Sequence, residues 1–210
     1  MIDDADELKR RYEEIAKSLD YRTTASDYQL RELEIDTAAE HIRPGMKMLD
    51  VGCGLGYAAT QYASRFGVEM YGIDFSENMI EGAKRVLRKN RQDLASRVDF
   101  KTASVTQLPF GGGMFDVVTS HRCLMALLDW ELQKNALVEI HRVLKPGGKL
   151  VWMEGTFEGL DRLNKTRGQF GLDPIAPDGR ERLITLKFHE SKLLAFCDPY
   201  YRLDHTQRFG

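Results

Sequence analysis

A glycine loop between an apolar run and a helix-like segment constrains the fold of this chain more than any other feature. Residues 47–51 form a short apolar run that is typical of a buried strand, and the sequence GCGLG at 52–56 follows it directly. Helical spacing covers residues 57–66, and a second short apolar run covers 68–73. Glycine has no Cβ, so a ligand can approach its backbone, and the first N–H groups of a helix point outward. The sequence therefore predicts a βαβ unit with a ligand-binding turn.

The alternation of strand-like and helix-like segments continues along the chain. Helical spacing resumes at residues 79–87, and further extended runs cover 98–103, 115–119 and 149–153. The clearest helical stripe lies between the last two runs, and we expect it to end at the turn sequence KPGG of residues 145–148. Alternating strands and helices favour a doubly wound, mostly parallel sheet with helices on both faces. The predicted fold class is a Rossmann-like α/β domain.

The two ends of the chain are predicted to extend this core within one domain. Residues 1–45 are expected to form a helical cap, whose second helix, near 27–41, buries Leu30, Leu33 and Ala38. Residues 46–154 form the core. In 155–210 the periodicity first fades into Gly, Pro and Asp residues, which predicts a loop-rich insert over 155–179. A last helix near 190–196 and a sixth strand near 200–209 are expected to follow.

Composition narrows the class of protein. Apolar residues make up 42% of the chain, charged residues 30%, and the net charge is −2. We expect a cytoplasmic protein that binds no membrane and no nucleic acid, because there is neither a long apolar stretch nor an excess of basic residues. The basic run at residues 84–91 is interpreted as a solvated helix face. Three widely separated cysteines predict neither a disulfide framework nor a zinc site, and no metal is expected.

The spacing of the glycines points to a particular class of ligand. They read G-x-G-x-G after Asp50, whereas a dinucleotide-binding loop reads G-x-G-x-x-G and holds a pyrophosphate. An aspartate repels a pyrophosphate but attracts the ammonium and sulfonium charges of S-adenosylmethionine (SAM). Asp74 follows Gly52 by twenty-two residues and ends the second strand, where an acid can bind both hydroxyls of a ribose. The alternative for Asp74 is an exposed charge at the start of a helix.

Four segments in order carry a family resemblance. They are LDVGCGLG at 49–56, GIDFSENMI at 72–80, LPFGGGMFDVVTS at 108–120 and EIHRVLKPGGKLVW at 139–152. Together they resemble the signature of class I SAM-dependent methyltransferases of the small-molecule type. The resemblance implies that SAM lies against the glycine loop and leaves as S-adenosylhomocysteine. The cofactor-binding residues that it implies are Asp50, Gly52, Cys53, Gly54, Gly56, Asp74, Phe75 and Met79.

Within that resemblance, the adenine contacts are the least regular part. Phe75 and Met79 would flank the adenine, although simple core packing explains them equally well. The family usually places a Gly-Asp or similar pair after its third strand, whose carboxylate accepts the adenine amino group, whereas this chain has Ser104 and Val105 there. A serine hydroxyl can still accept a hydrogen bond from the adenine amino group, so we expect retained but altered contacts.

Residues after the fourth strand face the transferring methyl group in this family. Here they begin with Ser120 and His121, which are expected to contact SAM, and continue to Arg122 and Met125, which are expected to contact the acceptor. His121 is the candidate catalytic base, because a histidine titrates near neutrality and can take the acceptor's proton. The alternative is that His121 only binds SAM or the loop. Arg122 could pair with a carboxylate or phosphate, or could simply be solvated.

The N-terminal helices supply the remaining acceptor-binding candidates. In related enzymes such a segment often closes the pocket, which makes Tyr12, Tyr21, Tyr28 and Arg31 candidates for a cap. Aromatic faces would attract a sulfonium. The alternative is partly buried packing of tyrosines at helical spacing.

The predicted function is methyl transfer from SAM to an oxygen or nitrogen of a small-molecule acceptor. An RNA or protein methyltransferase, an NAD-dependent oxidoreductase and a non-catalytic SAM-binding scaffold are the alternatives. Family members usually end in an antiparallel hairpin, and the last strand of that hairpin is expected to be absent here. Either a truncated C-terminus or a partner chain, as in a homodimer, would account for the exposed sheet edge.

Overall fold

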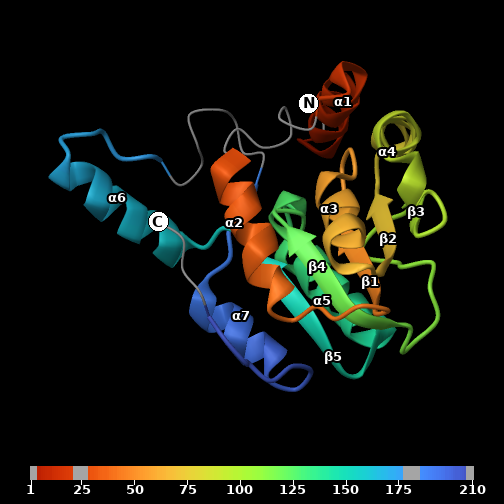
Figure 1. Cartoon of the computed structure of the whole chain (residues 1–210). Coiled ribbons are helices and arrows are strands. Elements are labelled where there is room, and N and C mark those ends of the chain that lie inside the picture. Colours follow the sequence, from red (N-terminus) through yellow and green to blue (C-terminus); the bar gives the residue numbers. More distant parts are fainter. Residues whose placement is uncertain (1–3, 21–27, 177–184, 207–210) are drawn as a thin grey trace.

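The computed structural model describes residues 4–20, 28–176 and 185–206 (Figure 1). The described strands form one five-stranded sheet in the order β3-β2-β1-β4-β5, and every neighbouring pair is parallel. The strands are β1 (Lys47–Val51), β2 (Glu69–Asp74), β3 (Val98–Thr102), β4 (Phe115–His121) and β5 (Leu144–Met153). The predicted Rossmann-like α/β class is confirmed. The strand order reverses between β1 and β4, and ligands bind at such a switch point in doubly wound sheets.

Helices cover both faces of the sheet. Those described are α1 (Asp4–Ser18), α2 (Tyr28–Ala39), α3 (Tyr57–Phe66), α4 (Glu77–Asn90), α5 (Trp130–Val143), α6 (Phe157–Gln169) and α7 (Glu190–Cys197), with 3₁₀ turns η2 (Gln92–Leu94) and η3 (Leu124–Ala126). Met48 of β1 packs in a cluster with residues of α2, α3 and α4, while its neighbour Leu49 packs in a second cluster with residues of α5 and α7. Both side chains are fully buried. Burial on two faces explains why the strands read as unbroken apolar runs.

The segment after β5 differs from the prediction. A loop-rich insert was expected at 155–179, but α6 occupies Phe157–Gln169 and extends away from the sheet (Figure 1). Thr156 caps the helix by accepting a hydrogen bond from the Gly159 N–H at 2.9 Å. Leu160 is the one buried side chain of this helix, so the sequence carries no apolar stripe that would have indicated it.

Three smaller predictions also need correction. The KPGG sequence does not form a separate turn between the helix and the last strand. The strand β5 already begins at Leu144 and contains these residues, where its register with β4 is irregular. The sixth strand is wrong for residues 200–206, which have no regular structure, and 207–209 lie outside the described residues. In α2, Leu33 is 46% exposed, whereas Glu34 and Ile35 are buried along with Ala38.

A groove of about 1350 Å³ follows the outer edge of β5. It is lined by Leu150 and Trp152 of β5, by Leu193 of α7 and by the segment 198–205, and it includes none of the predicted site residues. Within the described part of the chain, no helix is long and apolar enough to cross a membrane. The same residues contain no cluster of three or more His, Cys, Asp or Glu side chains that could hold a metal ion.

Candidate functional site

The glycine loop connects β1 to α3 in a conformation that favours glycine at each repeat. Gly52, Gly54 and Gly56 have φ angles of 69°, 52° and 77°, in the left-handed region. A Cβ on Gly52 would lie 2.5 Å from the Sγ of Cys123, and one on Gly56 would lie 2.4 Å from the ring of Phe100. The loop therefore packs closely against Cys123 and Phe100, which leaves no room for a side chain at Gly52 or Gly56.

Asp74 ties the end of β2 to this loop. Its carboxylate accepts hydrogen bonds from the Gly54 N–H at 3.0 Å and the Ser76 N–H at 2.9 Å. The residue is only 7% exposed, so the alternative of an exposed helix charge is wrong. Burial raises the pKa of Asp74 to about 6, although the two backbone N–H groups act in the opposite direction. A carboxylate has about four acceptor positions, so acceptor capacity remains for a ligand.

Asp50 lies at the other side of the loop, at the end of β1. It is 2% exposed and accepts a hydrogen bond from the Thr119 hydroxyl at 2.9 Å. Burial raises its pKa, and the nearby charges of His121 and Arg31 lower it by a smaller amount. The predicted acid before the glycines is thus a buried group at the end of β1.

The predicted adenine contacts are spread over a wider region. Phe75 is 43% exposed and meets Tyr12 edge-on, with ring centroids 5.9 Å apart. Met79 is fully buried with residues of α1 and Leu55 of the glycine loop, which is the core packing given as its alternative. Ser104 is exposed, and its hydroxyl hydrogen-bonds the Thr106 hydroxyl at 2.8 Å. Val105 is buried in the cluster on the α5 face.

His121, at the end of β4, contacts two residues that the sequence analysis missed. Its Nε2 lies 3.0 Å from the Tyr62 hydroxyl, and its Nδ1 lies 3.5 Å from Oε2 of Glu34. The imidazole side chain is 6% exposed. Tyr62 comes from α3 and is fully buried, and burial raises its pKa well above the usual range. No local motif marks either partner, because each reaches His121 from a different helix.

Glu34 also forms an ion pair with Arg122. Burial alone would raise the pKa of Glu34, but the hydrogen bond with His121 and the charge of Arg122 outweigh it and hold the pKa below its usual value. Arg122 adopts a left-handed backbone conformation, with φ of 55°, and its N–H donates to the Met153 carbonyl at 2.8 Å. The arginine is therefore engaged by α2, and the prediction that it is simply solvated is wrong.

Arg31, on α2, brings a second cation toward the site. Its guanidinium lies 5.9 Å from the centre of the Tyr57 ring, and burial and the charge of Arg122 lower its pKa, while the charge of Asp50 raises it. Tyr21 and the side chain of Tyr28 lie outside the described residues. Tyr12 lies on α1 beside Phe75. Among the predicted cap residues, the structure therefore brings Arg31 to the end of β1.

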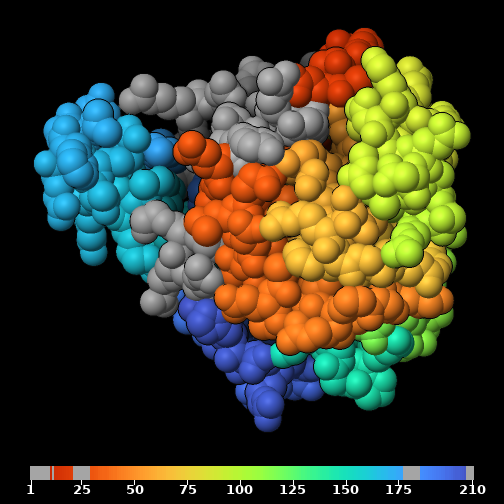
Figure 2. Space-filling model, in the orientation of Figure 1, coloured from red at the N-terminus to blue at the C-terminus, as the bar shows by residue number. Residues whose placement is uncertain are grey.

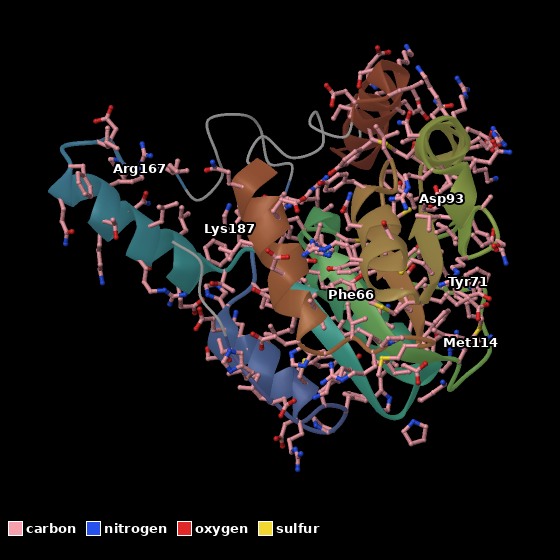
Figure 3. The ribbon with its side chains drawn as sticks, viewed as in Figure 1. Phe66, Tyr71, Asp93, Met114, Arg167 and Lys187 are labelled. Carbon is pink, nitrogen blue, oxygen red and sulfur yellow. The ribbon has the colours of Figure 1, made fainter. Side chains whose placement is uncertain are left out.

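The loop after β4 forms the remaining wall. The Ser120 hydroxyl donates to Glu154 at 2.5 Å, and Met125 is 8% exposed. Gly155 lies beside both Met125 and Lys187, a residue that Figure 3 labels on the segment before α7. The helices α2 and α3 contact each other and lie side by side on the surface in Figure 2. Predicted residues from β1, β4 and α2 thus meet at the carboxyl ends of the central strands.

Comparison with known proteins gives a consistent result. A model of a methyltransferase domain matches residues 48–148. The O-methyltransferase rstn1 of Aspergillus nomiae is 37% identical over 158 residues, which are 73% of this chain and 68% of that protein. This chain spans between 24% and 45% of the length of three further curated relatives.

Solved structures share the fold. A SAM-dependent methyltransferase from Methanosarcina mazei has a TM-score of 0.63 at 23% identity, covering 78% of this chain and 82% of that chain. Phosphoethanolamine N-methyltransferase 2 of Haemonchus contortus, solved in complex with SAM, has a TM-score of 0.58 at 25% identity, covering 82% of this chain and 36% of that chain.

The residues at the ends of β1 and β2 fit SAM. The glycine loop offers a backbone that a ligand can approach, and a Cβ on Gly52 or Gly56 would close against Cys123 or Phe100. Asp74 retains acceptor capacity beside the loop, and Asp50 supplies a buried acid. On the family model, the sequence relative and the shared fold, this chain belongs to the class I SAM-dependent methyltransferases.

Proposed function

We propose that this protein transfers a methyl group from SAM to an oxygen or nitrogen of a small-molecule acceptor. The observation that carries the proposal is the meeting of the glycine loop and Asp50 with the buried His121–Glu34 pair at the ends of β1 and β4. An O-methyltransferase and a phosphoethanolamine N-methyltransferase among the relatives support both acceptor atoms. Bound SAM supplies an electrophilic methyl group on a sulfonium.

The chain's own contribution is mainly binding and alignment. Asp74 accepts the ribose hydroxyls with the acceptor positions that Gly54 and Ser76 leave available. Asp50 favours the positive charges of the methionine part, and the chain near Ser104 and Val105 meets the adenine. Holding nucleophile, methyl carbon and sulfur in line supplies most of the rate enhancement in such a displacement.

His121 is proposed to take the proton of the acceptor. Its Nε2 lies 3.0 Å from the Tyr62 hydroxyl, and its Nδ1 lies 3.5 Å from Oε2 of Glu34. The Tyr62 hydroxyl holds the orientation of the ring, and the Glu34 carboxylate stabilises the imidazolium that forms. Because the imidazole side chain is only 6% exposed, the proton reaches it through a water molecule or after a shift of α2.

The acceptor is proposed to enter between α2 and the loop after β4. Arg31, Arg122 and Met125 would contact it there, and the tyrosines of the first two helices, Tyr12, Tyr21 and Tyr28, would close over it. Arg122 is already paired with Glu34, and the charges of Asp50 and Glu34 act on Arg31, so an uncharged or only weakly anionic acceptor is favoured.

Calorimetric titration with SAM and S-adenosylhomocysteine, with NADH as the comparison ligand, tests the cofactor part of the proposal. We expect micromolar binding of both sulfur ligands, no binding of NADH, and loss of binding in Asp74→Ala. A screen of small hydroxyl and amine acceptors with labelled SAM then tests transfer. Binding of SAM without transfer to any acceptor class, RNA and protein included, would replace the enzyme by a SAM-binding scaffold.

A further inference from the structure

Glu154, the residue directly after β5, holds the loop that follows β4. Its Oε1 accepts hydrogen bonds from the Ser120 hydroxyl at 2.5 Å and from the backbone N–H groups of Cys123 and Leu124, both at 3.0 Å. Its Oε2 accepts the N–H of Met125 at 3.1 Å. Three consecutive backbone donors at the start of η3 thus converge on one carboxylate, which satisfies N–H groups that a helix start leaves without partners.

Gln133 of α5 holds the opposite side of the same loop. Its side chain is 1% exposed, and its amide nitrogen donates to the carbonyls of Leu124 and Leu127 at 3.2 and 3.1 Å and lies 2.9 Å from that of Leu186. The N–H of Leu186 donates in turn to the Met125 carbonyl at 2.6 Å. Both the donors and the acceptors of residues 123–127 are therefore largely engaged, which leaves the loop little freedom to move.

The loop also touches the glycine loop directly. Cys123 lies against Gly52, where a Cβ would meet its Sγ at 2.5 Å. The glycine loop itself is held by other contacts, since Cys53 donates to the Ile73 carbonyl at 2.8 Å and Gly54 donates to Asp74. Glu154 makes none of these contacts with the glycine loop; its partners are the Ser120 hydroxyl and the backbone of residues 123–125, in the loop that carries the proposed acceptor contacts.

We infer that Glu154, assisted by Gln133, is a positioning residue that sets where the acceptor lies relative to the methyl group by fixing residues 122–127. The inference rests on the proposed function. A displacement of about 1 Å at the reacting atoms can cost on the order of 100-fold in rate, so a shift of this loop is felt in transfer. The loop carries Arg122 and Met125, two of the proposed acceptor contacts.

The test is Glu154→Gln, which keeps the size of the side chain but turns one accepting oxygen into a donor that faces backbone N–H groups. We expect kcat/KM for the acceptor to fall about 100-fold, while the Kd for SAM changes by less than about threefold. Hydrogen exchange of the amides of residues 123–125 should become about tenfold faster. Exchange is measured without an acceptor and so reports on the loop alone.

Asp116→Asn is the matched control. Asp116 also accepts a backbone N–H, that of Lys47 at 2.8 Å, and pairs with Lys145, but it lies at the amino ends of the strands. The Asp116→Asn variant should lower the free energy of unfolding without a change in kcat/KM or in hydrogen exchange at residues 123–125. If Glu154→Gln does not fold, Gln133→Ala removes the other side of the clamp and is expected to change the same three quantities in the same direction.

The outcomes separate this inference from the proposed function. A wild-type protein that binds SAM but methylates no acceptor contradicts the proposed function, and the inference falls with it. If the wild type is active and Glu154→Gln keeps its kcat/KM, the inference alone is overturned. Loss of SAM affinity in proportion to activity would also overturn it, because Glu154 would then support the cofactor site.

Discussion

Oε2 of Glu34 and Nδ1 of His121 lie 3.5 Å apart, although one residue belongs to the N-terminal helix α2 and the other ends the central strand β4. Arg122, the next residue in the chain, pairs with the other oxygen of the same carboxylate. Both acidic and imidazole side chains are 6% exposed. These contacts of Glu34 hold α2 against the carboxyl end of β4, and they give His121, the proposed base, an acidic neighbour.

Removal of Glu34 should therefore destabilise the protein strongly. Glu34→Ala leaves Arg122, whose side chain is 30% exposed, without its acid partner, and we expect the free energy of unfolding to fall by about 2 kcal/mol in urea denaturation. Asp36→Ala on the same helix is the control, since Asp36 is 56% exposed and pairs with Arg65 at the surface, where an ion pair contributes less than about 1 kcal/mol. Equal losses for the two variants would show that the buried pair has no special role.

The pH dependence of this pair has a defined sign. The pKa of Glu34 in the folded protein is below its unfolded value of 4.5, so the stabilisation is fully present above pH 4.5 and is lost as the pH falls through the folded pKa. The difference in unfolding free energy between wild type and Glu34→Gln should shrink over that acidic range. A difference that stays constant from pH 7 to pH 3 would contradict this assignment.

The pH dependence of stability that Asp74 contributes has the opposite sign. Its folded pKa of about 6 lies above the unfolded value of 3.8, so its contribution to stability is full below pH 3.8 and is lost as the pH rises through 6. Ribose hydroxyls need the ionised carboxylate, so the Kd for SAM should be about tenfold weaker at pH 5 than at pH 7. Calorimetry across this range checks the prediction, and Asp74→Asn should bind weakly at every pH without that step.

His121 and Tyr62 should affect turnover more than cofactor binding. His121→Ala is expected to lower kcat by about 100-fold or more because the proton acceptor is lost, with little change in the Kd for SAM. Tyr62→Phe removes the hydroxyl 3.0 Å from Nε2 and should lower kcat by about tenfold because the ring loses a hydrogen bond that holds its orientation. If His121→Ala loses SAM affinity and keeps kcat, the binding alternative for His121 is correct.

Two glycine positions allow the cost of steric packing to be separated from the cost of a left-handed backbone. Gly56 and Gly45 have similar φ angles, 77° and 81°, but a Cβ would meet the Phe100 ring at 2.4 Å in the first case and nothing within 4 Å in the second. Both alanine variants should lose about 1–2 kcal/mol for the left-handed backbone. Gly56→Ala should lose about 2 kcal/mol more in urea denaturation, because Phe100 must move. Equal losses would mean that Phe100 adjusts freely.

Local patterns in the sequence were enough to predict the framework of the fold. The strands β1, β2 and β4 are largely buried and so appear as short apolar runs, whereas β3 alternates buried and exposed residues. The amphipathic stripes of α4 and α5 are equally visible. The helix α6 was missed because Leu160 is its one buried residue. Leu33 was assigned to the buried face of α2, although that face carries the acid Glu34 instead.

The sequence by itself determined the glycine loop, the strand-end acids Asp50 and Asp74, and the family, because each depends on residues adjacent or regularly spaced in the chain. Only the tertiary structure decided that Glu34 and Tyr62 meet His121, and that Glu154 and Gln133 clamp the loop after β4. These residues are buried polar groups whose partners come from separate elements. A buried polar residue leaves no periodic signal, since its burial is stabilised by hydrogen bonds and charges that exist only after the chain has folded.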